Sequence, residues 1–461
     1  NLMGVRKTGS SYQSLGDLWL DFDHGKDVQA YQRELDIENA MAGVRYRVKN
    51  VAYAREVFSS APDQSIIIRL TADKKENISF SLRLTRLGDK ASIETGDSTI
   101  VLTEHVNNGV GVKLVTSVKV LNEGGSITRS KDGLKVEKAD AVTLVLTAAT
   151  DYWGGDPAQL SAAQLAKAEK KTYADLRKDH IADYQTYFKR VDLHLGTNAS
   201  TYFPTDARLA AVQKGNADPQ LLRLYYQFGR YLLISSSRPG GLPANLQGIW
   251  ADGLNPPWDA DYHININIQM NYWPSEVTNL TEMHRPFLDF INALRPDGRK
   301  TAKDMYGLKG TVAHFTTDAW HFTETYGHPQ WAAWPMGMAW CASHLWEHYL
   351  FTEDKDFLAQ DAYPAMKEAA EFCVSWLVQN PQTGQLVSGP SISPENTFKT
   401  AGGEVATMVM GPTMDHMIIR ELLTNTIKAA TILNVDKSFR KTAQKTLDKL
   451  APTKIGSDGR I

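Results

Sequence analysis

The sequence predicts a multidomain β + α protein with an N-terminal antiparallel β-sandwich, a helical linker and a helical toroid. Short β-rich runs with turn residues between them occupy the first third of the 461 residues. A stretch rich in Ala, Gln and Lys follows, and long helical patterns separated by long loops make up the rest. Strands followed by helices are typical of separate domains. We therefore place the sandwich at 1–152, the linker at 153–200 and the toroid at 201–461.

The N-terminal prediction rests on repeated short strands. In residues 78–84, apolar and polar side chains alternate strictly, which is typical of a strand with one buried face. Gly124-Gly125 and Lys131-Asp132-Gly133 supply turns. The strand candidates are residues 65–71, 78–84, 112–120 and 141–147. Such runs, with turns between them, favour an antiparallel sandwich.

The remainder of the chain is predominantly helical. Linker helices are expected at 158–170 and 172–190, which are rich in helix-forming residues. Further candidates are residues 218–236, 282–306, 333–351, 354–379, 412–433 and 436–449. Loops at 238–262 and 381–411 separate some of them, and loops of this length in a compact domain are usually functional. A helical solenoid is the competing architecture, although no fixed repeat period is present.

Composition argues against several classes of protein. The chain has 50 Lys and Arg against 52 Asp and Glu, a net charge of −2, so no strong field attracts nucleic acid. No run of 18 apolar residues occurs, so no membrane span is expected. Cys341 and Cys373 lie in apolar helical contexts and are expected to be buried thiols, with a single disulfide left open. No Cys/His spacing of a zinc site occurs.

Aromatic residues are concentrated in one part of the chain. Nine of the 11 tryptophans fall between Trp250 and Trp376, and seven of the 12 histidines fall between His263 and His348. Trp and His side chains need partners for their N–H groups when they are buried. We expect a polar-aromatic pocket in this region, with a large aromatic core as the alternative.

An alternating run within this region carries a row of polar side chains. His263, Asn265, Asn267 and Gln269 would share one face of an extended stretch, and the intervening isoleucines would anchor the other face. Amide and imidazole groups in a row suit the binding of hydroxyl groups or the orientation of a water molecule. A buried polar ladder satisfied by the backbone is the alternative.

Three further segments belong to the candidate site. They are residues 313–321, residues 330–337 and residues 387–397. His344 and His348 follow the second of these on a predicted helix, where a packed helix face is a better interpretation than half of a zinc site. Glu395 lies in a Ser-, Pro- and Gly-rich loop. If it is buried, its pKa would rise and suit it to general acid catalysis, whereas a helix cap or a surface loop is the alternative.

Four motifs together resemble glycoside hydrolase family 95, whose members are inverting α-L-fucosidases with some α-L-galactosidases. They are the run from Gly241 to Pro274, Trp334-Pro335-Met336-Gly337, Ser393-Pro394-Glu395-Asn396 and the early Tyr12-Gln13-Ser14-Leu15-Gly16-Asp17-Leu18. The resemblance spans nearly the whole chain. It implies an N-terminal β-sandwich, a helical linker, an (α/α)6 barrel and a C-terminal β-domain.

The resemblance also implies roles for individual residues. Glu395 would be the general acid that protonates the leaving glycosidic oxygen. Asn265 and Asn267 would hold the attacking water for an aspartate base, because an amide orients water but is no strong base. His263 would line the sugar pocket, and our hypothesis is that it faces C6 and favours fucose. Further sugar-binding candidates are Trp334, Trp250 and His314. Inversion by this route implies no cofactor and no metal.

Some features depart from the family pattern. The Asp-Gly-Asn-Phe-Gly motif near the expected base and the Gly-His-Arg-His segment are absent, and both would follow Ile461. We therefore expect the barrel to be incomplete at its C-terminus, the base to lie outside these residues, and this chain alone to show little turnover. The second loop reads His314-Phe315-Thr316-Thr317-Asp318 where relatives often carry His-His-Asn-Thr-Asp.

The expected partners are fucosylated or L-galactosylated glycans, with no nucleic acid and no membrane. A bacterial periplasmic or extracellular location is expected, although the first residues carry no signal peptide. Nothing in the sequence indicates an oligomeric state. A polysaccharide lyase would need more cationic residues between 250 and 350, and a phosphorylase would need a phosphate-binding loop. A non-catalytic carbohydrate-binding protein on the same fold is the strongest alternative.

Overall fold

A computed structural model describes residues 11–88 and 90–460. They divide into two compact units. The sandwich unit comprises Tyr12–Ile234 with Ala251–Pro256, and the helical unit comprises Ser235–Trp250 with the chain from Pro257 onward. The predicted boundary at 200/201 therefore differs from the division between units, because the segment up to Ile234 groups with the sandwich.

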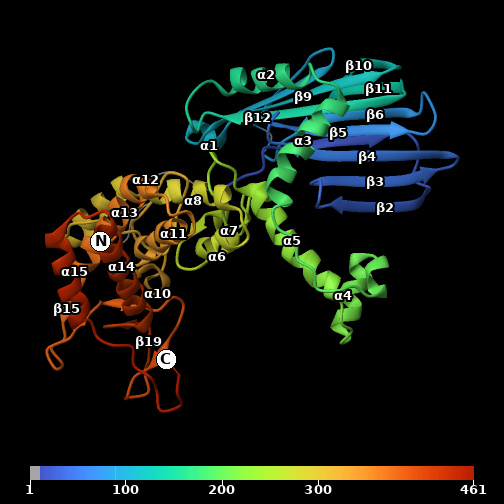
Figure 1. Cartoon of the computed structure of the whole chain (residues 1–461). Coiled ribbons are helices and arrows are strands. Elements are labelled where there is room, and N and C mark those ends of the chain that lie inside the picture. Colours follow the sequence, from blue (N-terminus) through green and yellow to red (C-terminus); the bar gives the residue numbers. More distant parts are fainter. Residues whose placement is uncertain (1–10, 89, 461) are drawn as a thin grey trace. The chain divides into compact units, whose positions relative to one another are not determined.

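The sandwich unit contains two antiparallel sheets, which confirms the predicted sandwich (Figure 1). The strand orders are β1-β6-β11-β10 and β2-β3-β4-β5-β12-β9-β8-β7. The strands are β1 (Asp17–Phe22), β2 (Val28–Asp36), β3 (Met41–Val48), β4 (Val51–Ser60), β5 (Ser65–Ala72), β6 (Ile78–Thr85), β7 (Ser92–Thr95), β8 (Thr99–His105), β9 (Lys113–Glu123), β10 (Ser126–Ser130), β11 (Gly133–Ala139) and β12 (Ala141–Thr150), and a short α1 (Val106–Gly109) precedes β9. The four runs predicted as strands correspond to β5, β6, β9 and β12.

Strand β12 shows how the sandwich is packed. Val142 and Leu144 enter the core between the two sheets, while Val145 points to the opposite face and joins a second apolar cluster. Successive side chains of a strand point to opposite faces, so a strand that is covered on both sides reads as a continuous apolar run. The apolar run of β12 follows from this double burial.

The turn between β9 and β10 consists of two glycines. Gly124 and Gly125 have φ angles of 67° and 63°, the conformation that two-residue hairpin turns require and that glycine adopts at little cost. A Cβ atom at Gly125 would lie 2.2 Å from the Glu137 carbonyl oxygen. Both the left-handed backbone and the close approach therefore favour glycine here.

The second apolar cluster attaches the linker helices α2 (Pro157–Ala168) and α3 (Tyr173–Phe188) to the eight-stranded sheet. Asp156 and Thr172 cap the two N-termini by accepting backbone N–H bonds, as N-cap residues commonly do. The cluster contains Met41, Phe58, Ile67, Val145, Ala168 and Leu176. The two predicted linker helices are confirmed to within about three residues.

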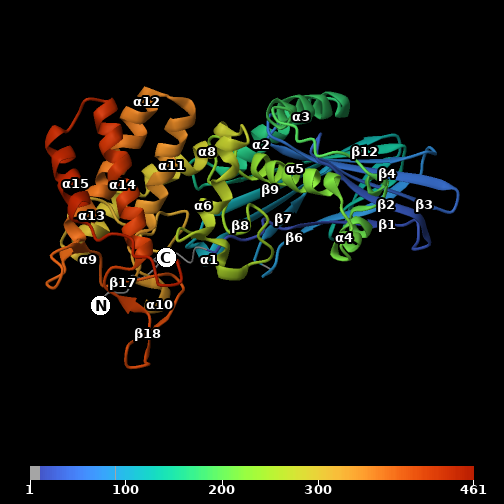
Figure 2. The ribbon, with the colours of Figure 1, turned by 60° about the horizontal axis from the view of Figure 1, so that its bottom comes forward.

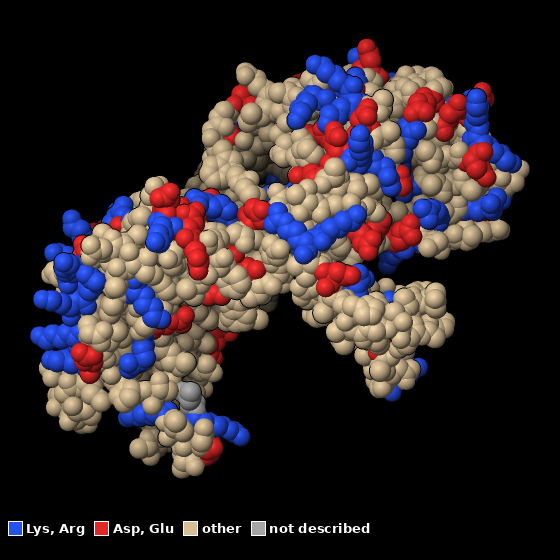
Figure 3. All heavy atoms as spheres, in the orientation of Figure 1, with Lys and Arg blue, Asp and Glu red and all other residues tan. Residues whose placement is uncertain are grey.

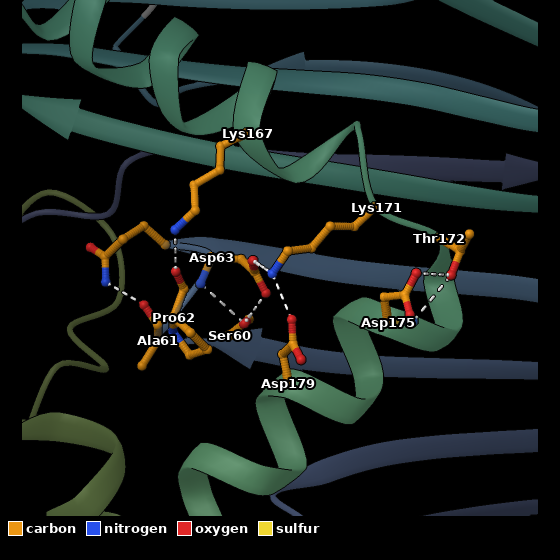
Figure 4. Close-up of polar contacts among 10 residues, drawn as sticks. Ser60, Ala61, Pro62, Asp63, Lys167, Lys171, Thr172, Asp175 and Asp179 are labelled. Atoms are coloured by element: carbon orange, nitrogen blue, oxygen red, sulfur yellow. Dashed lines mark hydrogen bonds and ion pairs between the residues drawn. The ribbon is translucent and has the colours of Figure 1, made fainter.

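A buried carboxylate fixes the end of α2 to the turn between β4 and β5 (Figure 4). The Lys171 ammonium lies 2.6 Å from Asp63 Oδ1 and 2.7 Å from Asp179 Oδ2 on α3. The Asp63 side chain is fully buried and also accepts a 2.7 Å bond from the Ser60 hydroxyl. Lys171 is therefore the cation that compensates a buried charge between sheet and linker.

Replacing Lys171 with Met keeps the aliphatic chain but removes the cation from Asp63. We expect Lys171→Met to lower the free energy of unfolding by about 2 kcal/mol, because a buried charged group loses a partner. Lys167→Met is the matched control, since Lys167 donates to the Pro62 carbonyl and is exposed; we expect a change below about 0.5 kcal/mol. Urea denaturation followed by far-ultraviolet circular dichroism measures both, and equal losses would contradict the assignment.

The sandwich unit ends in η1 (Ala199–Tyr202), α4 (Thr205–Gln213) and most of α5 (Pro219–Ser236). The Arg208 guanidinium holds the Asp218 carboxylate through two bonds of 2.8 and 2.9 Å, which joins α4 to the start of α5. Arg230 on α5 is buried and donates to the Phe188 and Tyr187 carbonyls at the end of α3. These bonds explain why α5 groups with the sandwich.

In the helical unit, α11, α13 and α14 contact one another and α14 also contacts α15, and Figure 2 shows these four helices side by side. Its helices are η2 (Pro257–Ala260), α6 (Asn267–Tyr272), α7 (Pro274–Val277), α8 (Thr281–Ala293), α9 (Arg295–Tyr306), α10 (Pro329–Ala332), α11 (Gly337–Thr352), α12 (Lys355–Phe357), η3 (Leu358–Ala362), α13 (Tyr363–Trp376), α14 (Thr413–Ile432) and α15 (Lys437–Lys449). The helix predicted at 282–306 is divided into α8 and α9, because Pro296 lacks the N–H that a continuous helix would use.

The long loop predicted at 381–411 contains short two-residue strands. Four of them pair as β17 (Ser391–Ile392) with β20 (Met408–Val409) and β18 (Phe398–Lys399) with β19 (Val405–Ala406). The remaining pair joins β15 (Val378–Gln379) to β16 (Leu386–Val387). The loop is therefore a folded excursion between α13 and α14.

Cys341 and Cys373 are free and buried, so the predicted buried thiols are confirmed and the disulfide left open is not formed.

Figure 3 shows acidic and basic side chains interspersed on the visible face, with Lys and Arg gathered over α15. In the described part of the chain, no helix has both the length and the apolar character required to cross a bilayer.

Candidate active site

A two-stranded ribbon brings two of the predicted segments together. In β13 (Tyr262–His263) and β14 (Thr316–Thr317), His263 pairs with Thr316 and Tyr262 with Thr317. The Ile264 N–H then donates to the Phe315 carbonyl at 2.8 Å. The polar run that starts at His263 therefore lies beside the loop of residues 313–321.

The predicted extended stretch with four polar groups on one face is wrong beyond this ribbon. The chain turns at Ile266 and α6 begins at Asn267, so the period changes from two to 3.6 residues. Asn265 is buried and Asn267 is exposed. Gln269 is fully buried in α6, where its Nε2 donates to the Ile264 carbonyl at 2.7 Å. These groups do not form one row.

The Asn265 side chain carries an unused acceptor. The residue is 7% exposed, and its Oδ1 has no hydrogen-bond partner among the described residues. Buried polar atoms are nearly always paired, so an orphan of this kind needs an explanation. An amide oxygen that is free inside a site suits the binding of a water molecule or a hydroxyl group.

His263 is held by a buried aspartate. Its Nδ1 lies 2.5 Å from Asp261 Oδ1, and Asp261 Oδ2 accepts a 2.7 Å bond from the Thr316 hydroxyl. The His263 and Phe315 rings stand nearly perpendicular to each other, at a centroid distance of 5.5 Å and an angle of 84°. The imidazole is therefore fixed on the ribbon, and its side chain keeps 15% exposure.

Two predicted sugar contacts are instead packed inside the helical unit. Trp334 is fully buried and its Nε1 donates to Asp415 Oδ1 at 3.0 Å, so it offers no ring face for stacking on a sugar. His314 is also fully buried; its Nδ1 lies 2.7 Å from the Thr323 carbonyl and its Nε2 2.7 Å from the Tyr306 hydroxyl. Burial lowers the pKa of His314 to about 4. Both predictions for these residues are corrected to core positions.

Helix α11 approaches the ribbon at a glycine. A Cβ atom at Gly337 would lie 2.3 Å from the His314 carbonyl oxygen and 2.6 Å from Ile264 Cδ1. Any larger residue would push α11 away from the segments that contain His314 and Ile264. Gly337 therefore sets the distance between the third segment and the ribbon.

The fourth segment leads from β17 into the loop that carries Glu395. This residue is exposed, so the burial on which the sequence argument for a raised pKa depended is not present. Trp250, the remaining candidate, is 49% exposed and presents an indole to solvent. Among the described residues, no hydrogen bond or ion pair joins Glu395 to Asn265 or Asn267.

Asp415, at the start of α14, is a buried carboxyl group that connects the third and fourth segments. It accepts from the Trp334 indole, and it is completely inaccessible to solvent. Burial raises the pKa of Asp415 to about 7, even though the Ser391 and Ser388 hydroxyls and the Trp334 indole favour the ionised form. This carboxyl group therefore changes charge near neutral pH.

A second buried carboxylate cross-links α7, α8 and α11. Glu276 Oε1 accepts from His284 Nδ1 at 2.8 Å and His348 Nδ1 at 2.7 Å, and Oε2 accepts from the Thr281 hydroxyl at 2.7 Å. His284 Nε2 lies 2.9 Å from His344 Nδ1. Burial alone would raise the pKa of Glu276, but these hydrogen bonds outweigh it and lower the pKa to about 2.

Glu276, His284 and His348 are also residue types that bind metals, and their ligand atoms lie within 4.8 Å of one another. The contacts of 2.7–2.8 Å are hydrogen-bond distances. Two ligands held about 2.0–2.1 Å from Zn²⁺ in a tetrahedral site would stand roughly 3.3 Å apart. We therefore describe the cluster as a hydrogen-bonded one. His344 and His348 are both buried on α11, in agreement with the prediction that they lie on a packed helix face.

Comparison with known proteins decides the family. The model of the glycosyl hydrolase family 95 catalytic domain matches residues 172–461, which is more than half of the chain. The chain belongs to glycosyl hydrolase family 95. The resemblance drawn from the motifs is thereby confirmed. The model of the glycosyl hydrolase family 65 N-terminal domain matches residues 1–155.

Two curated relatives of this family 95 chain cover nearly all of it. "Alpha-L-fucosidase 2" of Arabidopsis thaliana is 38% identical over 493 residues, which span 98% of this chain and 58% of that protein. "Probable alpha-fucosidase A" of Aspergillus niger (strain ATCC MYA-4892 / CBS 513.88 / FGSC A1513) is 31% identical over 485 residues, which span 100% of this chain and 60% of that protein. The chain thus spans about three fifths of the length of these relatives.

A solved structure titled "Putative kojibiose phosphorylase from human microbiome" resembles the family 95 chain in fold. The TM-score is 0.64 at 13% identity, over 94% of this chain and 59% of that one. The likeness is consistent with a β-sandwich joined to a helical domain of the (α/α)6 type, which confirms the predicted fold class.

No role was predicted from the sequence for three carboxyl groups of the family 95 chain. Asp261 lies two residues before His263 in the same alternating run, and this spacing could have identified it. Glu276 and Asp415 gave no such indication, because their partners lie up to 81 residues away in the sequence. Buried carboxyl groups with distant partners become visible only in the fold.

Proposed function

We propose that the protein containing this family 95 chain is an inverting glycoside hydrolase that removes terminal α-L-fucose from oligosaccharides, with α-L-galactose as the related alternative. Relatives that carry the names Alpha-L-fucosidase 2 and Probable alpha-fucosidase A support the substrate class. The ligands would then be fucosylated or L-galactosylated glycans. Binding of such glycans without hydrolysis is the outcome that the test below must exclude.

The observation that carries the proposal is the buried amide of Asn265. Its Oδ1 has no hydrogen-bond partner among the described residues, and an unpaired buried acceptor costs about 1–3 kcal/mol. A water molecule that donates to this oxygen would satisfy it and be oriented by it. We assign Asn265 to the positioning of the attacking water, and Asn267, exposed at the start of α6, to a second contact with the same water.

Glu395 is assigned as the general acid. Its exposed position on the loop after β17 leaves it accessible to a glycosidic oxygen. Inversion also needs a base on the opposite face of the sugar, with the two carboxyl groups roughly 6.5–9.5 Å apart. Asp261 does not suit this role, because both of its oxygens accept hydrogen bonds. We therefore assign the role of base to a different aspartate.

His263 is assigned to the C6 side of the sugar. L-fucose carries a methyl group at C6, whereas L-galactose carries a hydroxymethyl group. Asp261 and Phe315 restrain the His263 ring, so the ring cannot move aside to admit the larger group. Discrimination by one restrained side chain is worth roughly 1–3 kcal/mol, which favours fucose without excluding L-galactose.

Hydrolysis of 2′-fucosyllactose by the whole protein tests the proposal. We expect β-L-fucose as the first product in an NMR time course, and we expect Glu395→Gln to lower kcat by about 10²–10⁴-fold, because it removes the proton donor. Glu404→Gln is the matched control, since Glu404 is an exposed glutamate of the same loop, and it should retain activity.

Each other outcome changes a specific part of the proposal. Cleavage of an α-L-galactoside in preference to the fucoside would overturn the assignment of His263 to C6. Full activity of the Glu395→Gln variant would remove Glu395 from the role of acid. Binding of both sugars with no product from either would favour a carbohydrate-binding protein.

A further inference from the structure

We propose that Asp261 is a positioning residue for the sugar: it fixes the tautomer of His263 so that the Nε2 atom accepts a hydrogen bond from a ring hydroxyl of the bound pyranose. The inference rests on the proposed function and deepens it. Asp261, which is unsuited to be the base, would then contribute to substrate binding by acting through His263.

The geometry leaves the His263 ring one orientation. The Asp261 side chain is 4% exposed, and its Oδ1 lies 2.5 Å from His263 Nδ1. Thr316, opposite His263 in the ribbon, donates its hydroxyl to the other oxygen of Asp261 at 2.7 Å. The Phe315 ring stands nearly perpendicular to the imidazole. Imidazole rings whose second nitrogen must face a ligand are commonly oriented by such a carboxylate.

The chemistry of the pair sets the direction of the remaining hydrogen bond. An ionised carboxylate can only accept, so the proton of neutral His263 lies on Nδ1 and Nε2 keeps its lone pair. Nε2 has no hydrogen-bond partner among the described residues, and the side chain is 15% exposed. The ligand must therefore donate to it. The C6 methyl of L-fucose has no proton to donate, so the donor is a hydroxyl on the sugar ring.

Asp261→Asn removes the group that imposes one tautomer. Either the oxygen or the NH₂ group of the new amide can face His263, because the Thr316 hydroxyl can donate to the oxygen or accept from the NH₂ group. When the NH₂ group faces His263, Nδ1 must be unprotonated and the ring proton lies on Nε2. The variant is nearly isosteric, yet in a share of the molecules it would present a donor to the sugar in place of the acceptor.

Nitrogen NMR of the full chain labelled with ¹⁵N-histidine reads the tautomer directly, at about pH 8, with His263→Gln identifying the resonances. We expect protonated Nδ1 and unprotonated Nε2 in the unmodified chain, and a clearly measurable share of the reverse form in Asp261→Asn. Thr316→Val is the matched control: it removes the other bond of Asp261 and should leave the tautomer unchanged. The spectrum of the unmodified chain alone shows which nitrogen of His263 carries the proton. The proposal can therefore be contradicted even if a variant fails to fold.

Kinetics of the whole protein on 2′-fucosyllactose test the role in binding. We expect Asp261→Asn to raise KM roughly tenfold, with kcat within about threefold, and to have no added effect in the His263→Gln background. An Nε2-protonated ring in the unmodified chain, or an unchanged KM in Asp261→Asn, would overturn the inference. If the unmodified protein releases no sugar, the proposed function fails instead, and the NMR result still stands as a test of the pair.

Discussion

Replacing Glu276 with Gln is expected to lower the free energy of unfolding of the helical unit by about 3 kcal/mol at pH 7. The hydrogen bonds from His284, His348 and Thr281 lower the pKa of Glu276 from 4.5 to about 2, and a difference of this size corresponds to about 3 kcal/mol of preference for the ionised form. A glutamine would have the same shape but no charge, so the hydrogen bonds from His284 and His348 would lose their charge-assisted strength.

The pH dependence gives this prediction a second test. Because the folded pKa of Glu276 is depressed, its contribution is complete above pH 4.5 and is lost as the pH falls toward 2. The difference in free energy of unfolding between Glu276→Gln and the parent should therefore become smaller below pH 4.5. Urea denaturation followed by Trp fluorescence reports mainly on the helical unit, since nine of the 11 tryptophans lie between Trp250 and Trp376.

Glu347→Gln is the matched control for Glu276. Glu347 lies on α11 between His344 and His348 but is exposed, and burial raises rather than lowers its pKa. We expect a change within about 0.5 kcal/mol. An equal loss in both variants, or a Glu276→Gln difference that does not depend on pH, would contradict the role assigned to the cluster.

Asp415→Asn is expected to raise the free energy of unfolding, which is the opposite of the effect expected for Glu276→Gln. Burial raises the pKa of Asp415 from 3.8 to about 7, so the carboxyl group stabilises the fold below pH 3.8 and this contribution is lost as the pH rises through 7. The variant stays neutral and its amide oxygen can still accept from the Trp334 indole. We expect it to be about 4 kcal/mol more stable than the parent at pH 8, and nearly equal at pH 4.

The same denaturation experiment at pH 4 and pH 8 checks this prediction. Trp334→Phe serves as the contrasting variant, because it removes the indole donor to Asp415 and should destabilise the fold more at pH 8 than at pH 4. If Asp415→Asn is less stable than the parent at pH 8, the fold accommodates the charged carboxylate well. That result would contradict the prediction that burial disfavours the ionised form.

The predicted architecture agrees with the structure because it depends on local periodicity. The strand at 78–84 and the helix at 412–433 differ from β6 and α14 by one residue at their ends. Alternation misled us at His263–Gln269, since a run of that length fits a strand followed by a helix as well as one long strand. Ile268 and Tyr272 are buried at the i, i+4 spacing of α6.

The candidate site was predicted less completely, and the reason is physical. Residue type indicates that an imidazole or an indole needs a partner, but not which partner the fold supplies. Trp334 satisfies its N–H with Asp415 rather than facing a sugar, and Thr316 reaches Asp261 from 55 residues away. Such long-range pairs depend on how the helices and the ribbon pack, and no spacing in the sequence encodes them.

The contact at Gly337 also bears on the thermodynamics of the glycan binding proposed above. The His314 carbonyl and Ile264 leave no room for even a methyl group there, so α11 and the ribbon cannot shift independently. The groups on the ribbon are consequently ordered before any ligand arrives. Association at such a surface loses little conformational entropy in the protein, and the entropic cost falls instead on the sugar and its linkage.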